Sequence, residues 1–219
     1  MIYYIIFILG SYLIGGIPFG YIAGKLLKGI DIREHGSRNV GATNVLRVVG
    51  KGPGIAVYVL DALKGLLPVI LAKFLWPGTT VGLQWFYIAV ALAAILGHIF
   101  TPYLRFKGGE GVATASGAML ALAPLPLLIA LLAFILVFVL TRYVSLGSIT
   151  AALVFPIAVA LEKILRNQDP LVPVLGVGWL LFILVIVTHK ANIVRLVEGT
   201  ENKISFGTKT GENKEPRNA

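Results

Sequence analysis

Long apolar runs separated by short polar stretches constrain this chain more than any other feature of its sequence. They fill residues 2–24, 52–75, 84–101, 111–141, 146–162 and 171–188. Most are close to the ~20 residues that a helix needs to cross the hydrocarbon core of a bilayer. Because 57% of the 219 residues are hydrophobic and only 13% are charged, with a mean hydropathy of +0.87, we expect an all-α integral membrane protein.

The run at 111–141 has two interpretations, one long tilted helix or two short spans. Pro124-Leu125-Pro126 favours a break, because two prolines at this spacing interrupt a helix. Seven spans would also place 15 of the 19 Lys and Arg residues on one side of the membrane, as the positive-inside rule expects for the cytoplasm. The sequence therefore predicts seven transmembrane helices, an external N-terminus and a cytoplasmic C-terminus.

The ends of the chain carry two further expectations. The first run has no basic segment and no small-residue cleavage site before Lys25, so we interpret it as a retained span that Pro18 bends. Residues 1–201 are expected to form one polytopic domain, and residues 202–219 a polar, loosely ordered cytoplasmic tail.

Composition removes several classes of function. The net charge of +9 comes from basic loops between apolar spans, which membrane orientation and anionic ligands explain better than nucleic acid. The absence of cysteine excludes disulfides, thiolate nucleophiles and metal sites built on Cys. Since the three histidines are scattered at positions 35, 98 and 189, we expect no metal site.

Residues 36–47, here called the donor-rich stretch, stand out between two apolar spans. They read Gly-Ser-Arg-Asn-Val-Gly-Ala-Thr-Asn-Val-Leu-Arg and contain two guanidiniums, two carboxamides and two hydroxyls but no carboxylate. Gly36 and Gly41 allow the backbone to turn close to a ligand. The stretch is typical of an anion-binding site, although the positive-inside rule alone could also produce a basic loop here.

Asp61 and Lys64 lie inside the second apolar run at helical i, i+3 spacing. Charges at this depth are costly, so both should face the protein interior or a polar cavity. Two roles remain open: a structural ion pair that holds the helix against the site, or a pair that orients the basic ligands.

Three further polar stretches follow apolar runs. Residues 105–114 place Gly108, Gly109 and Gly111 after Lys107, which suggests backbone N–H groups around an oxyanion but lacks the Walker order. Residues 142–148 and 188–196 supply more hydroxyl, amide and basic groups. With seven spans, all these stretches lie at the cytoplasmic face, as one site built from several helix ends requires.

The four stretches, together with Gly97-His98, closely resemble the motifs of the bacterial membrane acyl-phosphate:glycerol-3-phosphate acyltransferases, in order and over nearly the whole chain. The resemblance implies a seven-span enzyme of the bacterial inner membrane. It would transfer an acyl group from acyl phosphate to the 1-hydroxyl of glycerol 3-phosphate, giving lysophosphatidic acid in the first committed step of phospholipid synthesis. Glu110 departs from the family pattern, which usually has Lys or Arg in this turn, and we expect its side chain to point away from the phosphates.

With this resemblance, the residues form a hypothesis for the site. The two substrates bring roughly 1.5 to 2 negative charges per phosphate and need several opposing donors. The residues expected to clamp the phosphates and align the hydroxyl are Ser37, Asn39, Asn44, Arg47, Lys107, Ser145, His189, Asn192 and Arg195. Backbone groups of residues 108–111, together with Thr114, are expected to bind the carbonyl oxyanion or the phosphate. The supporting residues are Gly41, Thr43, Asp61, Lys64 and His98.

Acyl phosphate is already activated, so positioning and charge neutralisation could supply much of the acceleration. A phosphate oxygen of the substrate would then accept the hydroxyl proton; the rival assignment makes His189 or His98 the general base. We expect no cofactor, a monomer, and contact with membrane lipid. The His-x-x-x-x-Asp pair of enzymes that use acyl thioesters is absent. A small phosphate or organic-anion transporter is the competing function.

Overall fold

The computed structural model describes residues 1–168 and 173–204, and within them it contains helices and no strand. The helices are α1 (Ile2–Gly16), α2 (Phe19–Lys28), α3 (Ala42–Val48), α4 (Lys51–Leu75), α5 (Val81–Ile99), α6 (Val112–Leu122), α7 (Pro124–Thr141), α8 (Val144–Leu165), α9 (Pro173–Thr188) and α10 (Lys190–Val197). Two short 3-10 turns, η1 (Ile32–Glu34) and η2 (Pro102–Leu104), lie in the connections.

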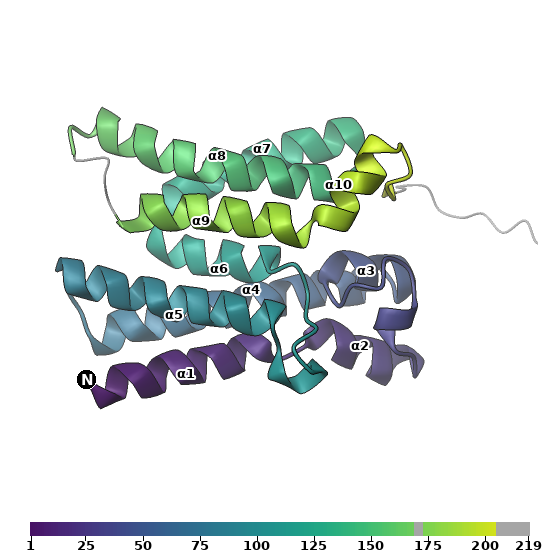
Figure 1. Ribbon diagram of the computed structural model, residues 1–219, viewed down its shortest axis with the longest axis horizontal. Helices are drawn as coiled ribbons and strands as arrows, with labels where there is room; N and C mark the ends of the chain where they lie inside the picture. The colour runs from purple at the N-terminus through teal and green to yellow at the C-terminus, as the bar shows by residue number, and fades with distance from the viewer. Residues whose placement is uncertain (169–172, 205–219) are drawn as a thin grey trace, which may run out of the picture.

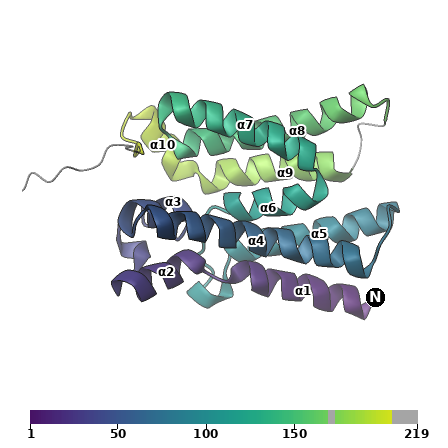
Figure 2. The same cartoon turned by 180° about the vertical axis from the view of Figure 1, so that it is seen from behind.

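Successive long helices run in opposite directions along the long axis of the molecule (Figure 1). α1, α5, α7 and α9 run towards the end where α2, α3 and α10 lie, and α4, α6 and α8 run away from it (Figure 2 shows the same order from behind). The polar stretches noted in the sequence therefore meet at one end of the molecule.

The helices support an integral membrane fold. Within residues 1–168 and 173–204, five helical segments are long and apolar enough to cross a bilayer: α1 with α2, α4, α5 with η2, α7, and α8. The bent pair of α9 and α10, with an angle of 63°, would make a sixth. The all-helical membrane class predicted from the sequence is confirmed. The expected fourth span, α6, has 11 residues, which is about 17 Å of helix against roughly 30 Å of hydrocarbon.

Proline residues set two of the helix boundaries, as predicted. α1 ends at Gly16 and α2 begins at Phe19, directly after Pro18. α6 ends at Leu122 and α7 begins at Pro124, in the first helical turn, where a missing N–H costs nothing. The apolar run at 111–141 is therefore two helices.

Small residues let the helices approach closely. A Cβ at Gly65 of α4 would collide with the Thr114 backbone of α6, and one at Gly117 of α6 with the Ala62 backbone of α4. α4 and α6 therefore pack backbone to backbone, which is common where lipid provides no hydrophobic drive for association. This contact holds α6 against the rest of the bundle.

The donor-rich stretch is held by a small hydrophobic core of its own. Buried Ile32, Val40 and Val45 pack with Val57 of α4 and Leu104 of η2. The chain from η1 to α3 is therefore fixed against α4. Most of the predicted tail, residues 205–219, lies outside the described residues, as do residues 171 and 172 of the predicted last span.

Candidate active site

A cavity of about 370 Å3 lies between α3, α4 and α6 on one side and α7, α8 and α9 on the other. Its polar end lies where α3, the turn before α6 and the start of α10 meet. On α9 the lining extends from His189 to Gly178, about 16 Å along the helix. The cavity can therefore take a polar head and a long apolar chain together.

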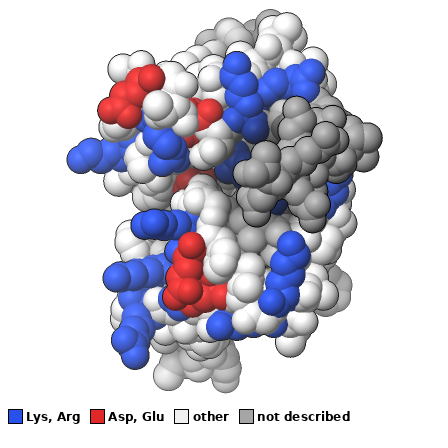
Figure 3. All heavy atoms as spheres, turned by 90° about the vertical axis from the view of Figure 1, so that its right-hand side faces the viewer, with Lys and Arg blue, Asp and Glu red and all other residues white. Residues whose placement is uncertain are grey.

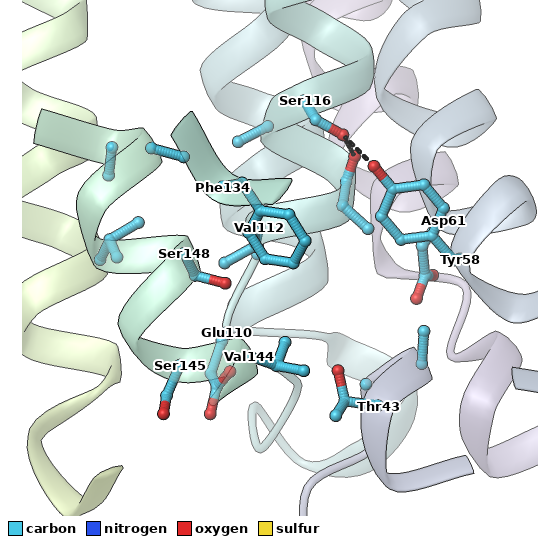
Figure 4. A pocket seen from close by; sticks show the side chains of 18 of the residues that line it. Thr43, Tyr58, Asp61, Glu110, Val112, Ser116, Phe134, Val144, Ser145 and Ser148 are labelled. Carbon is cyan, nitrogen blue, oxygen red and sulfur yellow. Dashed lines mark hydrogen bonds between the residues drawn. The ribbon is translucent and has the colours of Figure 1, made fainter. Parts of the chain in front are cut away.

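The polar and the apolar parts of the lining lie at different positions along the cavity. In Figure 4 the side chains of Glu110 and Ser145 lie close together at one end, with Thr43 of α3 opposite them. Phe134 and the hydrogen-bonded pair of Tyr58 and Ser116 lie farther along. The remaining apolar wall comes from side chains such as Met119, Leu127, Phe155 and Leu181.

The donor-rich stretch is folded around the Asn44 side chain, which is 1% exposed. Its Nδ2 donates to the carbonyl oxygens of Ile32, His35 and Asn39 at 3.2, 3.0 and 2.8 Å. Its Oδ1 accepts from the Ser37 N–H at 2.9 Å. Asn44 was expected to act on substrate, but here its carboxamide is used in shaping the backbone.

Two turns present the rest of the stretch to the cavity. Gly36 has a φ of +60°, a left-handed conformation that favours glycine. Asn39 Oδ1 accepts a hydrogen bond from the Gly41 N–H at 2.8 Å, which forms the turn that starts α3. As a result Ser37, Asn39 and Thr43 line the polar end of the cavity.

Arg47 reaches the cavity from the last turn of α3. Its Nη2 donates to the Asn202 carbonyl at 3.1 Å, and its Nε is buried without a hydrogen-bond partner. Burial lowers the pKa of its guanidinium, while Glu201 and Glu110 oppose this change. Because an arginine begins from a very high pKa, it keeps its charge, so a half-buried cationic donor faces the cavity.

The glycine-rich turn uses two of the N–H groups that the sequence assigned to an anion nest. The Gly108 N–H donates to the Ile99 carbonyl at 2.9 Å, and the Gly109 N–H donates to the His98 carbonyl at 3.1 Å. These two donors are therefore used to dock the turn on the end of α5. Gly111, with a φ of +83°, starts α6 and does line the cavity.

Glu110 points into the cavity, contrary to our expectation. Its Oε2 lies 3.2 Å from Nε2 of His189, which is 1% exposed at the end of α9. Its backbone carbonyl also accepts a hydrogen bond from the Thr188 hydroxyl at 3.4 Å. Glu110 thus connects the turn before α6 to the bend between α9 and α10, a tertiary contact that the local sequence does not reveal.

A second carboxylate, Glu201, was missed in the sequence. It is 7% exposed and accepts hydrogen bonds from Ser145, Asn192 and Arg195 at 3.1, 3.0 and 2.6 Å. Ser145 and Asn192 line the cavity, whereas Arg195 is turned towards Glu201 outside the lining. Glu201 lies in a short polar segment without a recognisable motif, so nothing in the sequence distinguished it.

The charged pair in α4 is buried as expected. Lys64 Nζ lies 2.7 Å from Asp61 Oδ1 and donates to the Ile17 carbonyl, at the break between α1 and α2, at 2.8 Å. His98 Nδ1 lies 3.7 Å from the same Asp61 oxygen. The three side chains connect α1, α4 and α5 directly beneath the glycine-rich turn, which favours the structural role among the two left open by the sequence.

Two further predicted ligands lie outside the cavity lining. Lys107 is exposed and does not line the cavity. Thr114 is fully buried between α6 and α4, with an unpartnered hydroxyl. Of the predicted residues, the structure brings these to the cavity: Ser37, Asn39, Gly41, Thr43, Asn44, Arg47, Asp61, His98, Gly111, Ser145, His189 and Asn192.

Cationic side chains surround the polar end of the molecule. Figure 3 views this end and shows Lys and Arg across most of the visible face, with a few Asp and Glu among them. Exposed members include Lys25 and Lys28 of α2, Lys51 at the start of α4 and Lys190 of α10. Such a face raises the local concentration of anionic ligands.

Comparison with known proteins gives a consistent result. Residues 5–199 match the family model of glycerol-3-phosphate acyltransferase. The chain is 46% identical over 205 residues to glycerol-3-phosphate acyltransferase of Desulforamulus reducens, covering 91% of this chain and 94% of that protein. It is 49% identical over 197 residues to the protein of the same name from Trichlorobacter lovleyi, covering 90% and 95%.

The fold is also similar to a solved structure. The crystal structure of PlsY (YgiH), an integral membrane glycerol 3-phosphate acyltransferase, in its glycerol 3-phosphate form superposes with a TM-score of 0.80 at 37% identity. The match covers 92% of this chain and 96% of that one. The lysophosphatidic acid form of the same protein gives a TM-score of 0.77.

Proposed function

The chain belongs to the glycerol-3-phosphate acyltransferase family, and from this membership we propose that it transfers a fatty acyl group from acyl phosphate to the 1-hydroxyl of glycerol 3-phosphate. The products would be lysophosphatidic acid and inorganic phosphate. Membership in this family places the protein in phospholipid synthesis. The acyl-phosphate donor and the mechanism are the parts that we propose.

One observation carries the proposal: the hydrogen-bond donors of the site lie at one end of a cavity whose remaining walls, among the helices, are apolar. Arg47 supplies an unpartnered buried N–H at the polar end. An acyl phosphate has the matching form, a charged head joined to a long chain. The acyl chain would enter from lipid, which has a similar polarity. Its transfer into the cavity therefore contributes little binding free energy, and the cavity would select acyl chains mainly by shape.

The reaction needs positioning more than an added catalyst. The phosphoric-carboxylic anhydride is an activated acyl donor, so holding the glycerol hydroxyl about 3 Å from its carbonyl carbon supplies much of the acceleration. Ser37, Arg47, Ser145 and Asn192 are the proposed ligands of the two phosphates. The hydroxyl proton passes to a phosphate oxygen of the acyl phosphate, and the departing phosphate carries it away.

Lys107 and Arg195 would join these ligands once substrate is bound. Lys107 is on a flexible stem beside the glycine-rich turn, and its ammonium can move to an entering phosphate. Arg195 would share its guanidinium between Glu201 and the substrate, since its five donors exceed what one carboxylate uses.

For the fold, we propose seven crossings with the N-terminus outside and the polar end in the cytoplasm. α6 would serve as a short fourth crossing, shielded from lipid on one side by its close packing on α4. The protein would act as a monomer in the bacterial cell membrane.

The test uses purified protein in detergent micelles with palmitoyl phosphate and glycerol 3-phosphate. We expect lysophosphatidate and phosphate in equal amounts. Absence of product, combined with glycerol 3-phosphate uptake by vesicles that contain the protein, would instead support transport.

A further inference from the structure

Both ring nitrogens of the buried His189 face acceptors. Nδ1 lies 3.0 Å from the Val185 carbonyl oxygen, and Nε2 lies 3.2 Å from Glu110 Oε2. A carbonyl oxygen can only accept, and an ionised carboxylate can only accept. A neutral imidazole carries one N–H and would leave one nitrogen lone pair against an oxygen. Only the doubly protonated ring donates to both.

We infer that Glu110 holds His189 as an imidazolium, so that His189 is a cation that neutralises Glu110 and not the base that accepts the substrate's proton. Glu110 is then a positioning residue for His189. This inference rests on the proposed function for its catalytic consequence, but the protonation of His189 can be measured without any acyl transfer.

The charges around the pair support this assignment. Two carboxylates, Glu110 and Glu201, lie at the polar end of the cavity. Arg195 Nε lies 2.6 Å from Glu201 Oε2, so the guanidinium neutralises the negative charge of Glu201. If His189 compensates Glu110, then Arg47 retains its positive charge for substrate phosphate; if His189 is neutral, Glu110 cancels Arg47.

The other titratable neighbours do not neutralise the Glu110 carboxylate. Asp61 and His98 line the cavity from α4 and α5, where Asp61 is already paired with Lys64 at 2.7 Å. The Thr188 hydroxyl, 3.4 Å from His189 Nδ1, also lies within reach of the Val185 and Glu110 carbonyls. Among the described residues, His189 is therefore the basic side chain in direct contact with Glu110.

The pair has a consequence for substrate binding. If His189 is removed, the Glu110 carboxylate remains in a site built for dianions and repels them. If Glu110 is removed as well, the repulsion disappears. The effects of substituting the two residues should therefore be coupled in substrate binding. Loss of a general base would instead affect the chemical step.

A double-mutant cycle tests this coupling with His189→Gln, Glu110→Gln and the double variant. We expect His189→Gln to raise the KM for glycerol 3-phosphate about tenfold or more, and the added Glu110→Gln to reverse most of that rise. A fall in kcat on His189→Gln that Glu110→Gln does not relieve would overturn the inference and identify His189 as the base.

Nitrogen NMR gives a direct readout that does not depend on activity or on the folding of the double variant. In protein labelled with 15N-histidine in micelles at pH 7, the His189 signals, identified by their loss in His189→Gln, should be those of a doubly protonated ring. In Glu110→Gln they should become those of a neutral ring. A neutral His189 in the parent protein would contradict the inference even if acyl transfer is observed. A doubly protonated His189 without acyl transfer would leave it standing and refute only the proposed function.

Discussion

The backbone N–H of Ser37 donates a hydrogen bond to the side-chain oxygen of Asn44 at 2.9 Å. The nitrogen of the same carboxamide contacts three carbonyl oxygens between η1 and α3. One buried side chain therefore determines where the Ser37 hydroxyl enters the cavity. Asn44 therefore affects function indirectly, because its side chain fixes the backbone that carries Ser37.

Asn44→Ala should therefore destabilise the protein as well as lower its activity. The substitution leaves several buried backbone groups without a partner, and each such group costs about 1–3 kcal/mol. We expect the unfolding temperature in detergent to fall by about 5 °C or more. Gln84→Ala is the matched control, since the half-buried Gln84 carboxamide donates to one carbonyl, that of Thr79. Equal unfolding temperatures for the two variants would contradict the role of Asn44.

Arg47→Ala should abolish acyl transfer while leaving the fold intact. The half-buried guanidinium is the donor proposed to neutralise charge on the transferring acyl phosphate, and loss of such a donor costs about a hundredfold to a thousandfold in kcat. Arg38→Ala is the control, because Arg38 is exposed and does not line the cavity. Comparable activities of these two variants in a lysophosphatidate assay would exclude Arg47 from the site.

Lys107→Ala tests whether an exposed side chain moves onto the bound substrate. If it does, the KM for glycerol 3-phosphate should rise about tenfold or more, as expected for a lost charge-assisted hydrogen bond. Arg105→Ala, two residues earlier on the same connection and also exposed, should leave KM unchanged. An unchanged KM in Lys107→Ala would mean that the lysine stays in solvent throughout the reaction.

Gly108→Ala should disrupt the turn before α6. A Cβ at this position would collide with the His98 carbonyl and lie 2.7 Å from the Ile99 carbonyl, the two groups on which the turn docks. We expect lower activity and a lower unfolding temperature. Gly82→Ala, in the first turn of α5 with open space around it, should be neutral or slightly stabilising. Full activity of Gly108→Ala would show that the docking is unnecessary.

The stability of η1, the turn that precedes the donor-rich stretch, should depend on pH through the Asp31 carboxylate. The Arg33 side chain donates to its carboxylate and lowers the pKa of Asp31 from 3.8 to about 2. A lowered folded-state pKa gives stability that is present above about pH 4 and is lost as the pH falls towards 2. Asp31→Asn should therefore increase amide hydrogen exchange in η1 at pH 6, and this difference should shrink below pH 4. A constant difference down to pH 3 or below would contradict the pairing.

Sequence patterns predicted the elements whose causes are local. Pro18 and Pro124 interrupt helices because proline lacks an N–H and fixes φ, wherever the surrounding helices lie. The burial of Asp61 with Lys64 followed from the cost of isolated charge in an apolar helix. The assembly of the polar stretches at one end followed from alternating helix directions.

Features fixed by tertiary contact were not predictable in the same way. α3 has only 7 residues, too few to show helical periodicity, and forms because its apolar side packs on α4. The direction of the Glu110 side chain depends on His189, which is distant in sequence, and that of the Gly108 N–H depends on how the turn folds back on the Ile99 carbonyl at the end of α5. The glycine pattern correctly indicated a tight turn but not which carbonyl groups its donors would meet.

The most direct measurement of the central claim compares acyl donors on one preparation of the purified protein. Palmitoyl phosphate, palmitoyl-coenzyme A and a palmitoylated acyl carrier protein are each supplied with radiolabelled glycerol 3-phosphate, and lysophosphatidate is counted, with Arg47→Ala as the inactive control. Product from palmitoyl phosphate alone, absent in Arg47→Ala, is the predicted result. Product from a thioester but none from palmitoyl phosphate would contradict the proposed reaction.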